Sequence, residues 1–370
     1  MLLPSISTPA RNTGALLFML GALALAGCSS GIATDPPSQT PAGSPSAGGT
    51  VTLVTYDSYA VSKKVLADFT AETGVTIKIA RQGDAAEMVN RAILTKENPE
   101  GDVLFGVDQN TLARAVDNGL FQPFTSKESA AVPPKFQAEP AGIVTPIDYG
   151  DVCVNYDAEA FDRNNVEPPT TMADLAKPEY KDQLVVENPA TSTPGLAFLL
   201  ATVAKFGEPG AWDYWQSLKD NGVLAENSWD SAYYQQFSGG SGEGKRPLVV
   251  SYASSPAAEV VFAEEPPKNG KAPTGVLLDT CYQQVEYAGQ LANASNQAGA
   301  QALIDFMLSK RYQEDLPLQN FVFPVLPSAQ LPKVFTDNAQ TADQPLLVPI
   351  ADVTANRDAW VQRWTDIVAR

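Results

Sequence analysis

The chain of 370 residues contains no histidine. This absence excludes the Ser-His-Asp and Cys-His catalytic arrangements and any histidine-rich zinc site. Ser-x-x-Lys and P-loop motifs are also absent, which removes a further hydrolase class and a nucleotide-binding loop. Asp/Glu pairs could support glycoside chemistry, but among 42 acidic residues such pairs arise by chance. We therefore expect a protein that is not an enzyme, with no catalytic residues, no cofactor and no metal site.

Positive charge is also scarce. The chain has 25 Lys and Arg residues against 42 Asp and Glu residues, so its formal net charge is −17. Because an acidic surface repels a phosphate backbone, we expect no nucleic-acid partner. The same charge attracts small cations.

The apolar stretch near the N-terminus is too short for a comfortable membrane span. It runs from Ala15 to Ala26, about 12 residues, where a transmembrane helix needs about 20. One charged residue, Arg11, precedes it and small residues end it, as in a secretory signal peptide. The sequence at its end, Leu25-Ala26-Gly27-Cys28, resembles a bacterial lipobox. We expect a lipoprotein signal peptide over residues 1–27 and lipidation of Cys28; an ordinary signal peptide with a chance cysteine is the alternative.

Residues 28–50 comprise Cys28 and the segment SSGIATDPPSQTPAGSPSAGGT. This segment is rich in Ser, Thr, Gly and Pro and buries too little apolar surface to fold, so we expect a flexible linker. The body that follows is expected to be extracytoplasmic and attached to the cell membrane by a lipid anchor, in the periplasm or at the cell surface.

Cysteine is rare, and Cys153 and Cys281 remain after Cys28 is lipidated. In an exported chain two cysteines can form a disulfide, but their spacing does not decide it. Cys153 lies in DVCVNY, which has the character of a buried strand. The sequence leaves open whether the two cysteines form a disulfide or remain as buried thiols.

Strand and helix patterns alternate from residue 51 onward. The first set has strands at 51–56, 75–80 and 102–108 and helices at 62–74, 84–98 and 110–119. The short joins predict a parallel sheet with right-handed crossovers. The second set has strands at 151–157, 183–189 and 247–256, a helix that begins near Pro194, and a segment at 282–293 that could return to the first sheet.

The two sets predict an α/β protein with two lobes. Ligands of open α/β sheets bind beyond the carboxyl ends of strands and often between domains, so the joins after the strands are the candidate site. Near the C-terminus, Trp360, Trp364 and Ile367 have helical spacing, which is typical of a packing face.

Two helix starts carry groups that could cap the helix or bind a ligand. Asp84 and Glu87 have the spacing of a capping box, and the hydroxyl residues 191–193 precede the helix near Pro194. Since caps are commoner than ligand sites, the spacing alone favours capping at both places.

An aromatic segment, NSWDSAYYQQF (227–237), has three open interpretations. It could be a packed core segment, the wall of an aromatic pocket, or a source of two tyrosinate ligands for a ferric ion. The first hypothesis is that Trp229 lines a pocket while Tyr233 and Phe237, at positions i and i+4, pack into the second lobe. In the ferric alternative, Tyr233 and Tyr234 are the ligands.

The joins between elements follow one another in a recognisable order: TYDSY, GDAAEMVNR, DVLFGVDQN, GLFQPF, PIDYGDVCVNYD, NPATSTPGLAFLL, NSWDSAYYQQF and VVSYASSPA. In this order they closely resemble the thiamine-binding lipoproteins and periplasmic proteins of bacterial ABC importers. The resemblance runs from about residue 51 to the C-terminus, so only the signal and linker fall outside it.

The resemblance implies a fold. It is the two-lobed periplasmic-binding-protein-like fold of type II, which closes over a ligand in the interlobe cleft. Lobe 1 is expected to comprise residues 51–147 and 283–370 with the C-terminal helices, and lobe 2 residues 148–282. The strands that cross between the lobes are expected near residues 145–150 and 280–287.

The resemblance also implies a function and a site. The protein is expected to be a monomeric solute-binding protein that captures thiamine or thiamine phosphates and delivers them to an ABC transporter permease. Aromatic faces suit the cationic thiazolium, and a carboxylate and hydroxyls suit the aminopyrimidine. The ligand-binding residues that match the family motifs are Tyr56, Asp84, Ala85, Ser192, Thr193, Trp229, Tyr252, Ala253, Ser254 and Ser255.

The sequence departs from some family members at three aromatic positions. No tryptophan follows Tyr59, Ala258 stands where a tyrosine follows the SP motif, and Phe321 stands where a tryptophan occurs. The expected aromatic cage is therefore thinner, and the choice among thiamine, its phosphates and a related pyrimidine stays open. A ferric-iron receptor using Tyr233 and Tyr234 is the first alternative function, and a cell-surface enzyme acting on glycans is the next.

Overall fold

The structure is a computed structural model that describes residues 48–265, 267 and 270–369. The predicted signal peptide, the lipidation of Cys28 and the linker up to residue 47 lie outside the described residues. Within the part of the chain that is described, no helix is both long and apolar enough to cross a membrane.

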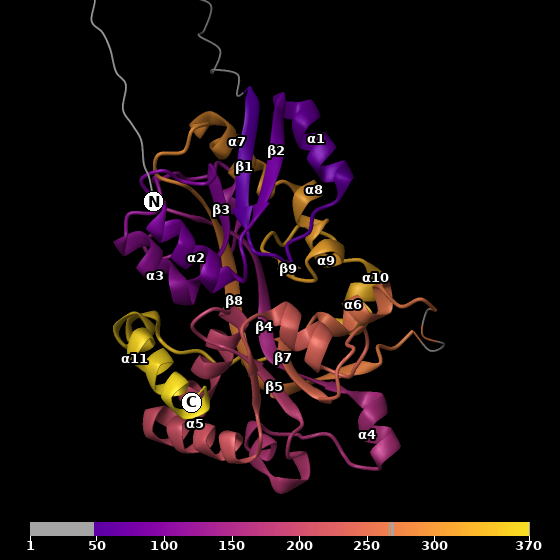
Figure 1. Cartoon of the computed structure of the whole chain (residues 1–370). Coiled ribbons are helices and arrows are strands. Elements are labelled where there is room, and N and C mark those ends of the chain that lie inside the picture. The colour runs from indigo at the N-terminus through magenta and orange to yellow at the C-terminus, as the bar shows by residue number, and fades with distance from the viewer. Residues whose placement is uncertain (1–47, 266, 268–269, 370) are drawn as a thin grey trace, which may run out of the picture. The chain divides into compact units, whose positions relative to one another are not determined.

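The strands of the described chain form one continuous sheet in the order β2–β1–β3–β8–β4–β7–β5–β6, with β9 paired to β4 (Figure 1). β1 is parallel to β2 and β3, as the first set of strand–helix units predicts. In the second set β5 is parallel to β6 and β7. The bounds are β1 Gly49–Thr55, β2 Val75–Arg81, β3 Val103–Asp108, β4 Thr145–Asp157, β5 Leu184–Glu187, β6 Leu224–Glu226, β7 Leu248–Tyr252, β8 Thr274–Gln290 and β9 Phe323–Pro324.

Helices pack around the two ends of this sheet, with α1, α2, α3 and α7 beside β1–β3 and α5 beside β5 and β7, while α4 contacts β8 (Figure 1). Every element predicted between residues 51 and 119 is present. The bounds are α1 Lys63–Thr73, α2 Ala85–Leu94, α3 Gln109–Asp117, α4 Ala158–Asn164, α5 Thr193–Asp220, α6 Ser255–Val261, α7 Gln297–Met307, α8 Lys310–Gln313, α9 Leu316–Gln319, α10 Lys333–Asn338 and α11 Ile350–Val368.

Helix α5 continues beyond Gly207. The backbone leaves the helix at Gly207, where φ is 70°, and Pro209 follows, yet helical structure resumes up to Asp220. Buried aromatic residues after the break, including Trp212 and Trp215, anchor this second segment in the core, so packing outweighs the local break.

Two long antiparallel strands, β4 and β8, join the two ends of the sheet. They pair from Thr145 opposite Ala288 to Asp157 opposite Thr274, and both are longer than the segments 151–157 and 282–293 predicted from the pattern. The expected crossing segments, 145–150 and 280–287, lie within them. A disulfide between Cys153 and Cys281 ties the two strands together, which decides the alternative that the sequence left open.

Each end of the sheet has its own hydrophobic core. We call β1–β3 with the core around Phe69, Met88 and Phe105 the first half, and β5–β7 with the core around Phe198 and Trp215 the second half.

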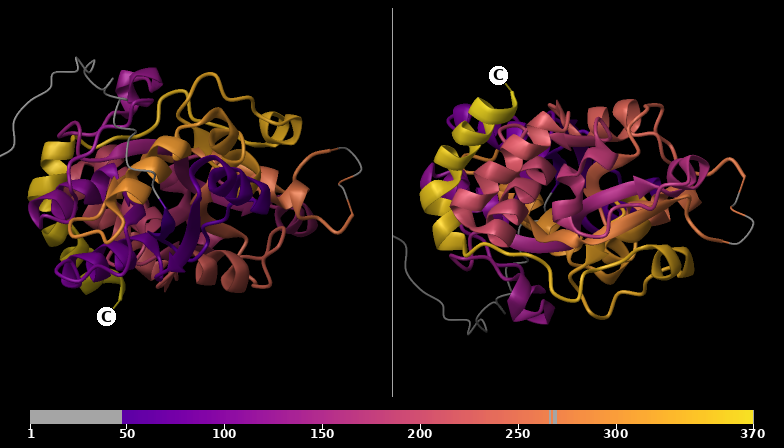
Figure 2. Two further views of the ribbon diagram at one scale, coloured as in Figure 1. Left: turned by 90° about the horizontal axis from the view of Figure 1, so that it is seen from above. Right: turned by 90° about the horizontal axis from the view of Figure 1, so that it is seen from below.

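The C-terminal helix α11 packs with the second half. Its Trp360 and Trp364 are buried, as the predicted packing face requires, and the rings of Trp215 and Trp364 are 5.6 Å apart. Figure 2 shows α11 in yellow along one side of the body. The sequence placed residues 283–370 together in lobe 1, whereas the side chains of α11 join the core of the second half; the lobe boundaries themselves stay a prediction.

Candidate ligand-binding site

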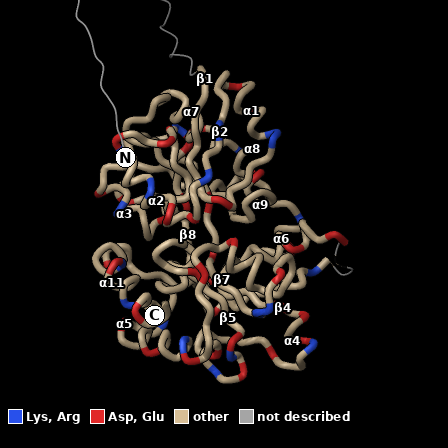
Figure 3. Tube along the Cα trace, viewed as in Figure 1, with Lys and Arg blue, Asp and Glu red and all other residues tan. Residues whose placement is uncertain are grey.

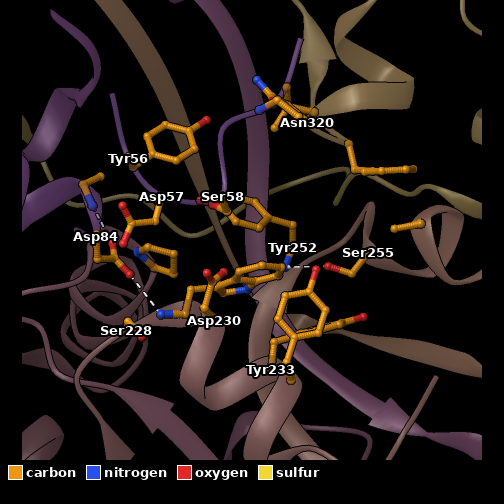
Figure 4. A pocket seen from close by; sticks show the side chains of 18 of the residues that line it. Tyr56, Asp57, Ser58, Asp84, Ser228, Asp230, Tyr233, Tyr252, Ser255 and Asn320 are labelled. Carbon is orange, nitrogen blue, oxygen red and sulfur yellow. Dashed lines mark hydrogen bonds between the residues drawn. The ribbon is translucent and has the colours of Figure 1, made fainter. Parts of the chain in front are cut away.

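A cavity of about 260 Å³ lies where the joins after β1 and β7 meet the starts of α2, α5 and α6 (Figure 4). We call it the central cavity. Since carboxyl ends of strands and helix starts converge here from both halves, it is where ligands of open α/β sheets bind. Its lining includes Tyr56, Asp57, Ser58, Asp84, Ala85, Thr193, Ser228, Trp229, Asp230, Tyr233, Tyr234, Tyr252, Ser255, Ala258, Glu259, Glu286, Asn320 and Phe321.

Asp84 connects the two halves at the edge of this cavity. As the cap of α2, its carboxylate accepts a hydrogen bond from the Ala85 amide at 2.6 Å and another from the Trp229 amide at 2.9 Å. Burial raises the pKa of Asp84 to about 6, although hydrogen bonds from these amides, Ser192 and Thr193 act in the opposite direction. Asp84 therefore both caps its helix and faces the cavity.

The predicted capping box between Asp84 and Glu87 does not form. The Glu87 amide, which would donate to Asp84 in such a box, instead donates to the Thr191 carbonyl of the second half at 3.0 Å. A hydrogen bond between the halves thus takes the place of the capping-box bond from the Glu87 amide, while Asp84 still caps α2 through the Ala85 amide.

One wall of the cavity is aromatic. The rings of Trp229 and Tyr233 stack 4.8 Å apart at 21°, because the turn at Ser231–Gln236 is π-helical and brings them onto one face. The indole Nε1 of Trp229 donates to Ser251 Oγ at 3.0 Å, which fixes the ring. Tyr233 and Phe237 are buried in the second half, as hypothesised, while Tyr233 also reaches the cavity.

The two adjacent tyrosines differ in their surroundings. Tyr233 donates its hydroxyl hydrogen to Glu259 Oε1 at 2.6 Å, whereas Tyr234 is 43% exposed. Burial and the charge of Glu259 raise the pKa of Tyr233 well above its usual value, and burial and Asp230 raise the pKa of Tyr234. Both phenols are therefore held in the protonated form. Among the described residues, no group of three or more Asp, Glu or Cys side chains could hold a metal ion.

The crossing strands place one carboxyl group, Glu286, in the lining of the cavity and a second, Asp148, next to it outside the lining. Glu286 of β8 is opposite Asp148 of β4 in the strand register, and both are buried. Tyr56 donates its hydroxyl hydrogen to Glu286 Oε2 at 3.1 Å. Burial, together with the neighbouring carboxylates Asp108 and Asp84, raises the pKa of Glu286 to about 8, and burial and Glu286 raise that of Asp148.

The Tyr56 ring fits because Gly106 has no side chain. At Gly106 the φ angle is +109° and a Cβ atom would lie 2.5 Å from Cδ1 of Tyr56. The same residue sits at the irregularity in the β3–β8 pairing. Only glycine adopts this backbone conformation readily and leaves room for the ring.

The structure brings most of the predicted site residues together. Those that line the central cavity are Tyr56, Asp84, Ala85, Thr193, Trp229, Tyr252 and Ser255.

Three predicted site residues are not part of the lining. Ser192 is buried and caps α5 by accepting from the Gly195 amide, and Ala253 packs beside the Cys153–Cys281 disulfide. Ser254 donates to the Phe321 carbonyl. These three side chains therefore bond or pack within the protein next to the lining.

Several lining residues were not predicted from the sequence. Asp57 and Asp230 directly follow the selected Tyr56 and Trp229, so the motifs contained them, but nothing local distinguishes them from surface carboxylates. Glu286 lies within a strand and reaches the cavity because β8 crosses between the halves. Two positions where the sequence departs from the family, Ala258 and Phe321, do lie on the wall.

Comparison with known proteins agrees with this geometry. The family model described as bacterial extracellular solute-binding protein matches residues 98–349. The chain is 30% identical over 329 residues to the thiamine-binding periplasmic protein of Brucella suis, covering 87% of this chain and 92% of the relative. It is also 25% identical to iron uptake protein A1 of Synechocystis, over 76% of this chain and 78% of that protein.

A solved structure confirms the expected fold. The periplasmic thiamin binding protein superposes with a TM-score of 0.75 at 27% identity, covering 87% of this chain and 96% of that one. This agreement confirms the two-lobed binding-protein fold of type II and the family resemblance of the motifs. The chain therefore belongs to the bacterial extracellular solute-binding proteins.

Proposed function

We propose that the protein captures thiamine outside the cytoplasm and delivers it to the permease of an ABC transporter. The observation that carries the proposal is the convergence of a stacked aromatic wall and several carboxylates on one small cavity. The faces of Trp229 and Tyr234 suit the cationic thiazolium. Asp84 and the Ser255 hydroxyl are suited to hydrogen-bond the aminopyrimidine. The names of the most similar relatives point to the same ligand.

Capture is coupled to closure through contacts between the two halves. Asp84 accepts from the Trp229 amide at 2.9 Å, and the Glu87 amide donates to the Thr191 carbonyl at 3.0 Å. A ligand that contacts both walls favours the conformation in which these bonds exist, and so shifts the population toward the closed state. The closed form is then the one that docks on the permease.

The proposal extends to location and partners. The body is attached to the membrane through lipidated Cys28 and acts as a monomer. The ATPase of the transporter drives uptake, and the protein itself turns over no substrate.

Ferric iron is the second candidate ligand, since an iron uptake protein is among the relatives. The tyrosine geometry disfavours it. The Tyr233 hydroxyl is hydrogen-bonded to Glu259, and the raised pKa values of both tyrosines oppose the two tyrosinates that the ion would require.

Isothermal titration calorimetry tests the proposal. The purified protein is unfolded and refolded to remove bound ligand, and is then titrated with thiamine and with ferric citrate. We expect one-to-one binding of thiamine and no binding of iron. Heat with ferric citrate and none with thiamine would replace thiamine by iron as the ligand.

A further inference from the structure

One buried side chain next to the central cavity hydrogen-bonds to three elements at once. Gln284 of the crossing strand β8 is 1% exposed and is not part of the cavity lining. Its Nε2 donates to Asp108 Oδ2 at 3.3 Å and to Thr193 Oγ1 at 3.1 Å, and its Oε1 accepts from the Tyr252 hydroxyl at 3.1 Å. These partners lie at the start of α3, the start of α5 and the end of β7. The amide is therefore bonded to the first half through Asp108 and to the second half through Thr193 and Tyr252.

Acidic surroundings fix the orientation of this amide. Figure 3 shows acidic residues on both sides of the junction between the halves, where β8 crosses. Asp108 is fully buried, and within the described chain its carboxylate accepts five hydrogen bonds, from Asn110, Thr111 and Gln284. Burial raises the pKa of Asp108, while the hydrogen bonds from Thr111 and Asn110 lower it. Because a carboxylate only accepts, the NH₂ group of Gln284 must face Asp108, and its carbonyl oxygen is turned to Tyr252.

The orientation of the amide decides what two hydroxyl groups offer to a ligand. Thr193 and Tyr252 both line the central cavity. Thr193 Oγ1 accepts from Gln284, so its own hydrogen is left for another acceptor. The Tyr252 hydroxyl donates its one hydrogen to Gln284, so its oxygen is left to accept. Burial and the neighbouring Glu286 and Asp84, which are also in the lining, raise the pKa of Tyr252 well above its usual value, so the hydroxyl keeps this hydrogen.

We propose that Gln284 is a positioning residue of the binding site: it fixes the directions of two hydroxyl groups, so that Thr193 donates to the ligand and Tyr252 accepts from it. This inference rests on the proposed function, in which the ligand is thiamine. Thiamine carries both an amino donor and ring-nitrogen acceptors, so it can bond to either hydroxyl. Without the amide, both hydroxyls are free to rotate, and binding must then fix their directions at a cost in affinity.

The test is calorimetric titration of the whole protein with thiamine. Gln284→Met keeps the length of the side chain and removes its amide. Gln290→Met is the matched control, because Gln290 is a fully buried glutamine of the same strand outside the cavity lining. A third variant combines Thr193→Val with Tyr252→Phe and so lacks both hydroxyls, and a fourth adds Gln284→Met to these two changes. Thermal melts establish that each variant is folded.

We expect Gln284→Met to lower the affinity for thiamine about tenfold and Gln290→Met to leave it within about twofold. If Gln284 acts through the two hydroxyls, adding Gln284→Met to the variant that lacks them should lower the affinity by less than about twofold. An unchanged affinity in Gln284→Met, an equal loss in Gln290→Met, or a further tenfold loss in the fourth variant would each overturn the positioning role but leave the proposed function standing. Absence of thiamine binding by wild type would overturn the proposed function together with this inference.

Asp108→Asn tests the same mechanism with Gln284 intact, should Gln284→Met fail to fold. Asparagine still caps α3, but its own amide can face Gln284 in either orientation, so the directions of the two hydroxyls are no longer fixed. The affinity for thiamine should fall severalfold in this variant and should change little when Asp108→Asn is added to the variant that lacks both hydroxyls. An equal loss in both backgrounds would show that Asp108 acts through its charge on a cationic ligand, and would overturn the positioning role.

Discussion

Two cavities lie along the crossing strand β8, and the proposed ligand site is the smaller of the two. The central cavity has a volume of about 260 Å³, and a second cavity, lined by residues that include Gln109, Lys135, Val285, Tyr287 and Ile350, has about 570 Å³. Neighbouring residues of β8 divide between them: Glu286 lines the central cavity, while Val285 and Tyr287 line the second. Successive side chains of a strand point to opposite faces, so one strand supplies both linings.

Gln109 and Lys135 of the second cavity are engaged within the protein. Gln109 donates to the Gln283 carbonyl at 2.6 Å and accepts from the Val285 amide at 2.8 Å. Lys135 lies 4.6 Å above the ring of Phe136. In the central cavity, by contrast, Asp230 and Glu286 have no cationic partner among the described residues. Unpaired charge and open aromatic faces, rather than volume, therefore distinguish the proposed ligand site from the second cavity.

The largest effect is expected on stability, from removing the disulfide that joins β4 to β8, the strand along which both cavities lie. Replacing Cys153 and Cys281 by Ala removes a cross-link that closes a loop of 128 residues. In the chain-entropy model this lowers the free energy of unfolding by about 4–5 kcal/mol. Urea unfolding followed by tryptophan fluorescence measures it. Reduced wild type should match the variant, and a loss below about 1 kcal/mol would contradict this expectation.

The next largest effect is expected on thiamine affinity, when one residue of each cavity is replaced. Trp229→Ala removes an aromatic face and its hydrogen bond to Ser251, so thiamine affinity should fall about 100-fold. Ile350→Ala, in the second cavity, should leave the affinity within about twofold because that cavity does not bind the ligand. Calorimetric titration of both variants with thiamine measures the two affinities. Loss of thiamine binding in Ile350→Ala, with binding retained in Trp229→Ala, would show that the second cavity and not the central cavity binds thiamine.

A pH profile tests the carboxyl pair beneath the central cavity. The pKa of Glu286 is raised to about 8, so much of it is protonated at pH 7, and a bound cation favours the carboxylate. Binding therefore lowers this pKa and releases a proton, so affinity should rise with pH from about 6 to about 8, by at most about tenfold per unit, and level off above. Calorimetry in two buffers of different ionisation enthalpy measures the proton release. The same slope in Glu286→Gln would assign it to another group.

The smallest effect is expected at the tyrosine pair. Replacing Tyr233 and Tyr234 by Phe keeps both aromatic rings and removes only the hydroxyls, so thiamine affinity should change less than about threefold. Ferric binding, if it occurred, would be abolished. Loss of thiamine binding in this variant, with a normal thermal melt, would show that the hydroxyls contact the ligand.

Local sequence was sufficient to predict the strands and helices up to residue 119 and part of the candidate site. Periodicity predicted the strand–helix units up to residue 119, and Asp84 does cap α2. The family motifs selected Tyr56, Trp229, Tyr252 and Ser255, all of which line the central cavity. These features depend on residues within a few positions of one another, which is why a single sequence records them.

The sequence by itself determined the absence of histidine chemistry, the acidic balance and the order of motifs that identifies the family. Only the tertiary structure decided which carboxylates line the central cavity, that Asp84 of the first half contacts the start of α5, and that Cys153 pairs with Cys281. The physical reason is distance along the chain. Asp57 and Asp230, like the two cysteines, become neighbours only when β4 and β8 bring the halves together, and no local pattern encodes that contact.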